Sequence, residues 1–400
     1  MSDQEDAVKA LGRTRLYPNY GEPPLVLQHG EGCELWDVAG RRYLDLYAGI
    51  AVSVLGHGHP RLVAAISEQA QRLLHVSNYY YSEPNVRLAD VLCQKTGYDR
   101  AFFCNSGTEA IEASLKLARR YHFSSGAPER WRIVAFENSF HGRTMGSLAV
   151  TGQPKYREGF GPLGGATHVP FGDLDGVARA LGADVAAILV EPIQGEGGVI
   201  PAPPGFLREL RRLADEAGAL LLFDEIQTGI GRTGYFLGAD HDAVRADAVV
   251  LAKGLGGGVP IGAMLCREAL ASALPPGSHG TTFGGNALAS AAALAVLGVI
   301  EEERLIERAR ELGSHLHQML ERLVDRMPAK VVASRGRGLL QALVLRDAEL
   351  ARRAQSDLRE AGVLVTLAGG DALRFTPPLT ITERQLDDGL AVVEKVLESL

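Results

Sequence analysis

One lysine follows a run of apolar residues in the stretch ADAVVLAKGLGGGVP, which spans residues 246–260. The run predicts a buried strand, and Lys253 comes directly after it. Burial lowers the pKa of a lysine and makes its neutral amine available to form an imine with a carbonyl group. A lysine that extends its amine to solvent or pairs with an acid is the alternative.

Two further polar groups follow apolar runs in the same way. Asp224 ends LLLFD, and a carboxylate buried there needs a cationic or hydrogen-bonding partner. Ser106-Gly107-Thr108 follows AFFCN and opens a helical pattern, so its backbone N–H groups could hold an anion such as phosphate. Taken singly, Asp224 could equally be a structural ion pair, and the serine a simple helix cap.

Together the three groups match the needs of one cofactor. Pyridoxal 5′-phosphate (PLP) requires an anion site for its phosphate, a carboxylate facing its ring nitrogen and a lysine for its aldehyde. We therefore expect Lys253 and Asp224 to be catalytic, with Lys253 also acting as general acid and base.

The elements that must position these groups alternate along the middle of the chain. Short apolar runs, including AFFC, RIVAF, VAAILV, LLLF and AVVLA, are separated by helical patterns. This alternation predicts an α/β domain with a mostly parallel sheet that is covered on both faces. Ligands of such sheets bind beyond the carboxyl ends of the strands, where the polar residues stand.

The two ends of the chain have a different pattern. Residues 20–48 indicate short strands, and the last hundred residues indicate a smaller α+β domain with which those strands could pair. We expect an N-terminal segment of the small domain over 1–50, a large cofactor-binding domain over 51–300 and the C-terminal small domain over 301–400. The apolar run from Ala287 continues into a charged pattern and predicts one long helix.

Composition excludes several classes of protein. Arg and Lys number 41 and Asp and Glu 48, giving a net charge of −7, which argues against nucleic acid as a partner. The four scattered cysteines and the acidic, polar start suit a cytoplasmic protein without a signal peptide. No apolar run is long enough to cross a membrane comfortably.

The histidines do not form a recognisable metal site. His57 and His59 lack further ligands at a suitable spacing, and His315 and His317 cannot face one another on a helix, so we expect no metal.

Longer motifs resemble a known family. LLLFDEIQTGIGRTG, LAKGLGGGVPIGAM and GTTFGGNALA occur in this order, and the resemblance extends from GEGCELWDVAGRRYLDLYAGIAV to LRFTPPLTIT. The chain resembles the class III (ornithine-type) PLP-dependent aminotransferases. The resemblance implies the fold type I architecture of PLP-dependent transferases, a large α/β domain with a smaller α+β domain, and a homodimer with shared active sites.

The resemblance also implies cofactor contacts. Lys253 matches the Schiff-base lysine, Asp224 the partner of the ring nitrogen and Phe140 the stacking ring. Further cofactor contacts fall on Ser106, Gly107, Thr108, Glu225, Ile226 and Gln227, and Thr282 matches a threonine that reaches the phosphate of the neighbouring subunit. His141, next to the stacking ring, is interpreted as structural.

Substrate contacts follow from the same resemblance. Arg143 matches an arginine that grips a carboxylate, and Arg374 a second one that a gate-like Glu196 releases. Tyr20, Ile50 and Thr281 fall where relatives contact the substrate. Such a gate would let one site accept an amino donor and then 2-oxoglutarate, in a ping-pong reaction.

Our prediction of the amino donor depends on one side chain. Ornithine-specific members carry a tyrosine where this chain has Ile50, and the missing hydroxyl favours an N-acylated donor. We expect the terminal amino group of N2-acetylornithine to be moved to 2-oxoglutarate, as in arginine biosynthesis. Succinylornithine, N-succinyl-diaminopimelate, ornithine and 4-aminobutyrate remain alternatives of the same class.

Three alternative functions other than transamination remain to be compared with the sequence. A PLP-dependent aminomutase or racemase would use the same lysine and aspartate. A dinucleotide-binding oxidoreductase needs a glycine-rich turn after its first strand, and none is recognisable. A non-catalytic protein of this fold would have no need of the lysine, the aspartate and the arginines.

Overall fold

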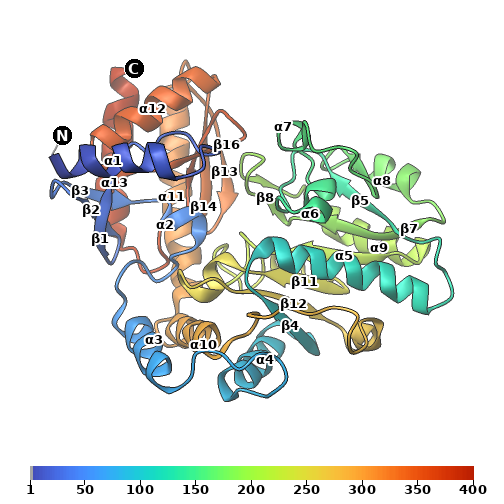
Figure 1. The fold of residues 1–400 in the computed structure, drawn as a ribbon. Coiled ribbons are helices and arrows are strands. Elements are labelled where there is room, and N and C mark those ends of the chain that lie inside the picture. The colour runs from blue at the N-terminus through green and yellow to red at the C-terminus, as the bar shows by residue number, and fades with distance from the viewer. Residues whose placement is uncertain (1–2) are drawn as a thin grey trace.

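A seven-stranded sheet forms the centre of the larger part of the molecule (Figure 1). The computed structural model describes residues 3–400. In order across the sheet, the strands are β4 (Arg100–Cys104), β12 (Gly262–Cys266), β11 (Ala248–Leu251), β10 (Leu220–Asp224), β7 (Val185–Val190), β5 (Arg132–Phe136) and β6 (Ala166–Val169). Neighbours are parallel except that β12 runs antiparallel to both β11 and β4. The predicted mostly parallel α/β sheet is confirmed.

Alternating side chains of the strands pack on opposite faces of this sheet. In β10, Leu220 and Leu222 belong to one buried cluster, whereas Leu221 and Phe223 belong to another. Helix α5 (Gly107–Ser124) covers the first face, and α9 (Phe206–Ala217) contributes to the core on the second. Because both faces are covered, the strands are apolar without interruption, as the sequence pattern indicated.

Further short elements complete this part of the molecule. The helices are α3 (Pro60–Arg72), α4 (Glu83–Thr96), α6 (Met145–Val150), α7 (Pro154–Arg157), α8 (Leu174–Ala180) and α10 (Ala287–Glu302). Strands β8 (Ile193–Gln194) and β9 (Ile200–Pro201) form a hairpin, and the 3₁₀ helices are η1 (Gly238–Asp242), η2 (Lys253–Gly256) and η3 (Glu268–Ala273).

Both ends of the chain meet in the smaller part, where the blue and red segments of Figure 1 lie together. One sheet has the order β1 (Leu27–Glu31), β2 (Glu34–Asp37), β3 (Arg42–Asp45) and β15 (Val363–Leu364), and the other β13 (Val331–Arg337), β14 (Leu340–Leu345), β17 (Ala372–Phe375) and β16 (Thr366–Ala368). Since β3 pairs in parallel with β15, the N-terminal strands do join the C-terminal part. The domain boundaries near residues 50 and 300 stay predictions.

The smaller part of the molecule also contains helices. They are α1 (Asp3–Arg15), α2 (Ala48–Ala51), α11 (Leu305–Arg326), α12 (Ala348–Glu360) and α13 (Glu383–Ser399). Helix α11 packs against β13, β14 and α13, and α12 packs against α13 and β15.

The prediction of one long helix from Ala287 is wrong, because the chain turns between α10 and α11. Arg304 has a left-handed backbone, with φ at 52°, and this ends the run of helical hydrogen bonds. Helix α10 packs on α3 and α4 in the larger part, whereas α11 crosses into the smaller part (Figure 1). Within residues 3–400, no helix has the length and apolar character needed to cross a membrane.

Candidate active site

A cavity of about 420 Å³ opens beyond the carboxyl ends of the parallel strands. It is lined by ten of the residues that the sequence assigned to the site: Ser106, Gly107, Thr108, Phe140, Arg143, Glu196, Asp224, Ile226, Gln227 and Lys253. These residues follow five different strands, and the parallel sheet brings their side chains to one edge.

Lys253 stands at the first position of η2, directly after β11 and Ala252. Its φ of 37° is a left-handed conformation that a lysine adopts only at a cost of about 1–3 kcal/mol. Burial lowers the pKa of its amine, an effect that the negative charge of Glu196 partly opposes. A buried amine of lowered pKa on a cavity wall is suited to nucleophilic attack on a carbonyl.

Asp224 ends β10 and is held by two hydrogen bonds. His141 Nδ1 lies 2.7 Å from its Oδ2, and the backbone N–H of Ile226 donates to its Oδ1 at 3.0 Å. Within residues 3–400, no lysine or arginine forms an ion pair with this buried carboxylate. Asp224 can therefore accept a proton or a charged hydrogen bond from a group in the cavity.

The N-terminus of α5 faces the same cavity. Ser106 caps the helix by accepting a hydrogen bond from the N–H of Glu109 at 3.3 Å. Gly107 begins the helix at a place where a β-carbon would stand 2.8 Å from Ile226 Cδ1, so a larger residue would collide with the cavity wall. The free amides of this first turn, with the positive end of the helix dipole, suit a phosphate group.

Glu191 links two loops that line the cavity. Its carboxylate accepts a hydrogen bond from the backbone N–H of Phe140 at 3.1 Å and from that of Gly195 at 3.3 Å. Burial, and next the nearby charge of Asp224, raise the pKa of Glu191 well above its usual range. The side chain thus fixes the Phe140 loop relative to the hairpin that carries Glu196.

Arg374 on β17 is buried and reaches this hairpin. Its Nη1 donates to the carboxylate of Glu196 and to Gln227 Oε1 at 3.2 Å, while its Nε donates to Thr366 Oγ1 at 3.1 Å. Burial alone would raise the pKa of Glu196, but the charges of Arg374 and Lys253 and the hydrogen bonds from Arg374 and Gln227 together outweigh it, so the pKa is lowered. Glu196 lines the cavity and Arg374 does not, so the Glu196 carboxylate separates Arg374 from the cavity.

Arg143 is the exposed cation of the cavity. Its guanidinium lies 4.7 Å from the ring centroid of Tyr156 and 5.8 Å from that of Phe140. In the part of the chain that the structure describes, no carboxylate forms an ion pair with Arg143. A planar guanidinium without an ion-pair partner can bind the carboxylate of a small molecule through two hydrogen bonds.

Comparisons with known proteins agree with this geometry. The model of the family "Aminotransferase class-III" matches residues 16–397. The chain belongs to the class III aminotransferases. It is 49% identical to the acetylornithine aminotransferase of Myxococcus xanthus, over 96% of this chain and 95% of that protein. It is 46% identical to the acetylornithine aminotransferase of Methanopyrus kandleri, over 95% of this chain and 96% of that protein.

Solved structures place this class III aminotransferase among enzymes of the same fold. An ornithine aminotransferase from Toxoplasma gondii, with PLP partly occupying its active site, superimposes with a TM-score of 0.94 at 35% identity, covering 99% of this chain and 94% of that one. An acetylornithine aminotransferase from Elizabethkingia anophelis gives 0.88 at 34% identity and covers 99% of each chain. PLP-dependent transferase fold type I, predicted from the motifs, is confirmed.

The enzyme is a PLP-dependent transaminase, and its cavity has the groups that this cofactor needs. Among residues 3–400, no lysine or arginine pairs with the buried Asp224 carboxylate, which suits a protonated ring nitrogen as its partner. The amine of Lys253 suits the aldehyde, and the capped N-terminus of α5 suits the phosphate. When bound, PLP supplies an electron-poor ring that takes up the electron pair released from a substrate carbon.

Glu225 departs from its expected place as a cofactor contact. Its carboxylate points away from the cavity and accepts hydrogen bonds from the N–H groups of Gly238 at 2.7 Å and Ala239 at 2.8 Å. Burial raises its pKa to about 7. Adjacent residues at a strand end point to opposite sides, so Asp224 faces the cavity and Glu225 the interior.

Four expected substrate or cofactor contacts also lie outside the lining of this cavity. Tyr20 is 74% exposed and Ile50 is 36% exposed, while Val52 lines the wall in place of Ile50. Thr281 Oγ1 accepts a hydrogen bond from Asn105 Nδ2 at 3.3 Å, and Thr282 is exposed. These side chains could reach a site only with the help of a second subunit or a movement of the chain.

His141 has a contact that the sequence analysis did not identify. It was interpreted as structural, and the structure shows that it lines the cavity and holds Asp224. Its position beside Phe140, in the segment that follows β5, was the signal that could have placed it at the site. Glu191 stood at another strand tip without an assigned role, because its partners are backbone amides that sequence cannot identify.

Proposed function

We propose that this transaminase moves the terminal amino group of N2-acetylornithine to 2-oxoglutarate, giving N-acetylglutamate 5-semialdehyde and glutamate, in arginine biosynthesis. The main support is the identity of 45–49% to several acetylornithine aminotransferases over nearly the whole chain. Two arginines in or behind the cavity, Arg143 and Arg374, match an acceptor that carries two carboxylates.

Lys253 carries the central role in this proposal. Its amine would hold the aldehyde of PLP, and the same amine, when free, would serve as the general base and acid of the site. Asp224 would keep the ring nitrogen protonated, and His141 orients Asp224. The first turn of α5 would hold the phosphate, and Phe140 would contact the ring.

Arg374 and Glu196 serve as the gate that separates the two substrates. Acetylornithine has one carboxylate, for which Arg143 suffices, and the Arg374–Glu196 pair stays closed. With 2-oxoglutarate, Glu196 gives up Arg374, which then binds the second carboxylate. The pair is charge-balanced in the first case, and in the second the substrate carboxylate replaces Glu196 as the partner of the buried Arg374, so the guanidinium is not left unpaired.

A homodimer is part of the proposal. Residues 79–81, three tyrosines that are each at least 75% exposed, form an apolar surface with Phe283, which is 60% exposed. Asn78 Nδ2 donates to the carbonyl of Thr281 at 3.1 Å and so joins the two segments. An apolar surface of this kind is typical of a subunit interface, and Thr282 lies on it, where it could reach the partner's phosphate site. Light scattering of the purified protein tests this, and a fully active monomer would refute it.

We also propose a cytoplasmic location. All four cysteines, Cys33, Cys93, Cys104 and Cys266, are free thiols. Free, mostly buried thiols suit a reducing compartment. Cell fractionation with an antibody against the protein tests the location.

A donor panel tests the substrate. The purified enzyme with added PLP is assayed with acetylornithine, succinylornithine, N-succinyl-diaminopimelate, ornithine and 4-aminobutyrate, with 2-oxoglutarate as acceptor and glutamate as readout. We expect kcat/KM for acetylornithine to exceed that for ornithine at least about tenfold. The free α-amino group of ornithine would lack a hydrogen-bonding partner in the site, and an unpaired polar group costs more than about 1 kcal/mol. A higher value for ornithine would overturn the choice of donor but not the reaction class.

A further inference from the structure

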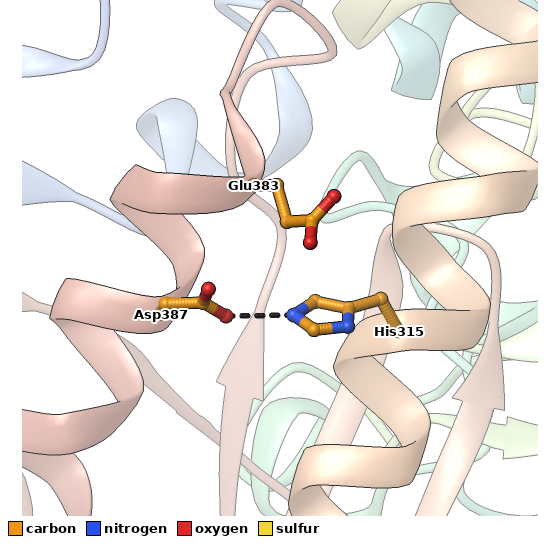
Figure 2. Close-up of side chains that lie close together, drawn as sticks. All are labelled: His315, Glu383 and Asp387. Atoms are coloured by element: carbon orange, nitrogen blue, oxygen red, sulfur yellow. Dashed lines mark hydrogen bonds and ion pairs between the residues drawn. The ribbon is translucent and has the colours of Figure 1, made fainter.

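Three side chains with metal-binding atoms meet between α11 and α13 (Figure 2). His315 belongs to α11, and Glu383 and Asp387 belong to the start of α13. One ligand atom from each of the three lies within 4.8 Å of the other two. His315 Nε2 is 2.6 Å from Asp387 Oδ1, and Figure 2 shows the Glu383 carboxylate directed toward this pair.

The positions of the three side chains follow from the helices that carry them. Glu383 and Asp387 are four residues apart, so they lie on one face of α13. The first turn of α13 is fixed by a capping box, in which Thr382 and Gln385 each accept a hydrogen bond from the other's backbone N–H. Since α11 packs against α13, His315 is held opposite that face.

Within residues 3–400, no lysine or arginine forms an ion pair with the two carboxylates of the cluster. In the described part of the chain, Glu383 has no lysine or arginine partner, whereas the neighbouring Asp388 pairs with Arg384. Glu383 and Asp387 are thus two carboxylates close together with only a histidine between them. A divalent cation would neutralise both carboxylates and use the imidazole nitrogen as a third ligand.

We propose that His315, Glu383 and Asp387 bind a divalent transition-metal ion, with Zn²⁺ as the representative ion. A mixed set of one imidazole and two carboxylates suits Zn²⁺ better than Mg²⁺, because Mg²⁺ prefers oxygen ligands alone. Ligand atoms on one tetrahedral Zn²⁺ ion stand about 3.3 Å apart, so the His315–Asp387 pair has to open by less than about 1 Å. Water completes the coordination, since the side chains of His315 and Asp387 are 27% and 47% exposed.

The ion would join α11 to α13 in the smaller part of the molecule. None of the three ligands lines the cavity that contains Lys253. The site therefore stabilises the C-terminal helices and takes no part in transamination. We expect Zn²⁺ to raise the melting temperature and to leave kcat unchanged.

Isothermal titration of the PLP-loaded enzyme with ZnCl₂ tests the site. We expect one equivalent per chain to bind with a dissociation constant in the micromolar range, and MgCl₂ to bind at least tenfold more weakly. The substitutions His315→Gln, Glu383→Gln and Asp387→Asn should each weaken Zn²⁺ binding at least tenfold and abolish the Zn²⁺-dependent rise in melting temperature. His317→Gln and Asp388→Asn, on the same two helices, are matched controls and should bind Zn²⁺ as the unaltered enzyme does.

Glu383→Gln distinguishes a metal site from a simple ion pair. This variant keeps the His315–Asp387 hydrogen bond and changes an exposed side chain, so it should fold normally. If the unaltered enzyme binds no stoichiometric Zn²⁺, or if Glu383→Gln binds it equally well, the three residues are only an ion pair with a neighbour and the proposal fails.

Discussion

His141 Nδ1 lies 2.7 Å from Asp224 Oδ2, and both side chains are buried at the edge of the cavity. An ionised carboxylate can only accept, so His141 donates this hydrogen bond. The bond fixes the direction of Asp224 and leaves its other oxygen to the backbone N–H of Ile226. His141 is therefore a positioning residue for the carboxylate that we assign to the PLP ring nitrogen.

Replacing His141 should lower activity through Asp224. We expect His141→Ala to reduce kcat/KM by about 10–100-fold, since a hydrogen bond to a charged group contributes about 1.5–3 kcal/mol. His141→Asn should recover much of the loss, because its amide nitrogen takes the place of Nδ1. Steady-state kinetics and the affinity for PLP measure both effects. If the alanine and asparagine variants are equally impaired, His141 has only a packing role.

Removing the Lys253 amine should abolish catalysis. We expect Lys253→Ala to lower kcat by roughly 10⁴-fold or more, because the nucleophile and the proton carrier are lost together. Borohydride reduction of the unaltered enzyme should fix PLP on the peptide that contains Lys253, as mass spectrometry can establish. A variant that retains near-normal turnover, or labelling of a different lysine, would overturn the assignment.

Freeing Arg374 should change the balance of the two half-reactions. Glu196→Ala leaves the Arg374 guanidinium without its carboxylate partner and so favours the acceptor, which carries two carboxylates. We expect the ratio of kcat/KM for acetylornithine to that for 2-oxoglutarate to fall at least about tenfold, a change of about 1.4 kcal/mol. Stopped-flow measurement of each half-reaction gives the ratio. If both half-reactions of Glu196→Ala proceed at the rates of the unaltered enzyme, Glu196 does not act as a gate.

Acid should destabilise the fold partly through His168. Burial, and next the charge of Arg157, lower the pKa of this imidazole from its ordinary 6.5 to about 4. The unfolded chain then takes up the proton first, so stability is lost as the pH falls from 6.5 toward 4. Between pH 7 and pH 5 the loss from this residue should be roughly 1–2 kcal/mol after allowance for partial exposure.

Urea unfolding at the two pH values measures this loss. His168→Gln should show a smaller decrease in the free energy of unfolding between pH 7 and pH 5 than the unaltered protein. His29→Gln, which alters an exposed histidine, is the control and should leave the decrease as it was. If both variants behave alike, His168 does not titrate as described.

Lys253 and Asp224 could be identified from sequence because their surroundings are local. Each follows a run of apolar residues, and such a run both builds the strand and carries the polar residue to the sheet edge. The break at Arg304 could not be identified, because both sides of it are good helical sequence. It is set by the different surfaces on which α10 and α11 pack.

The amino-acid sequence by itself determined the α/β class, the strand-end location of the site and the pairing of an amine with a carboxylate and an anion cradle. Only the tertiary structure decided that His141 orients Asp224, that Glu225 turns inward and that Glu196 closes on Arg374. The partners in these contacts come from separate strands and loops. Their pairing depends on side-chain direction and packing, which a periodic pattern along the chain does not record.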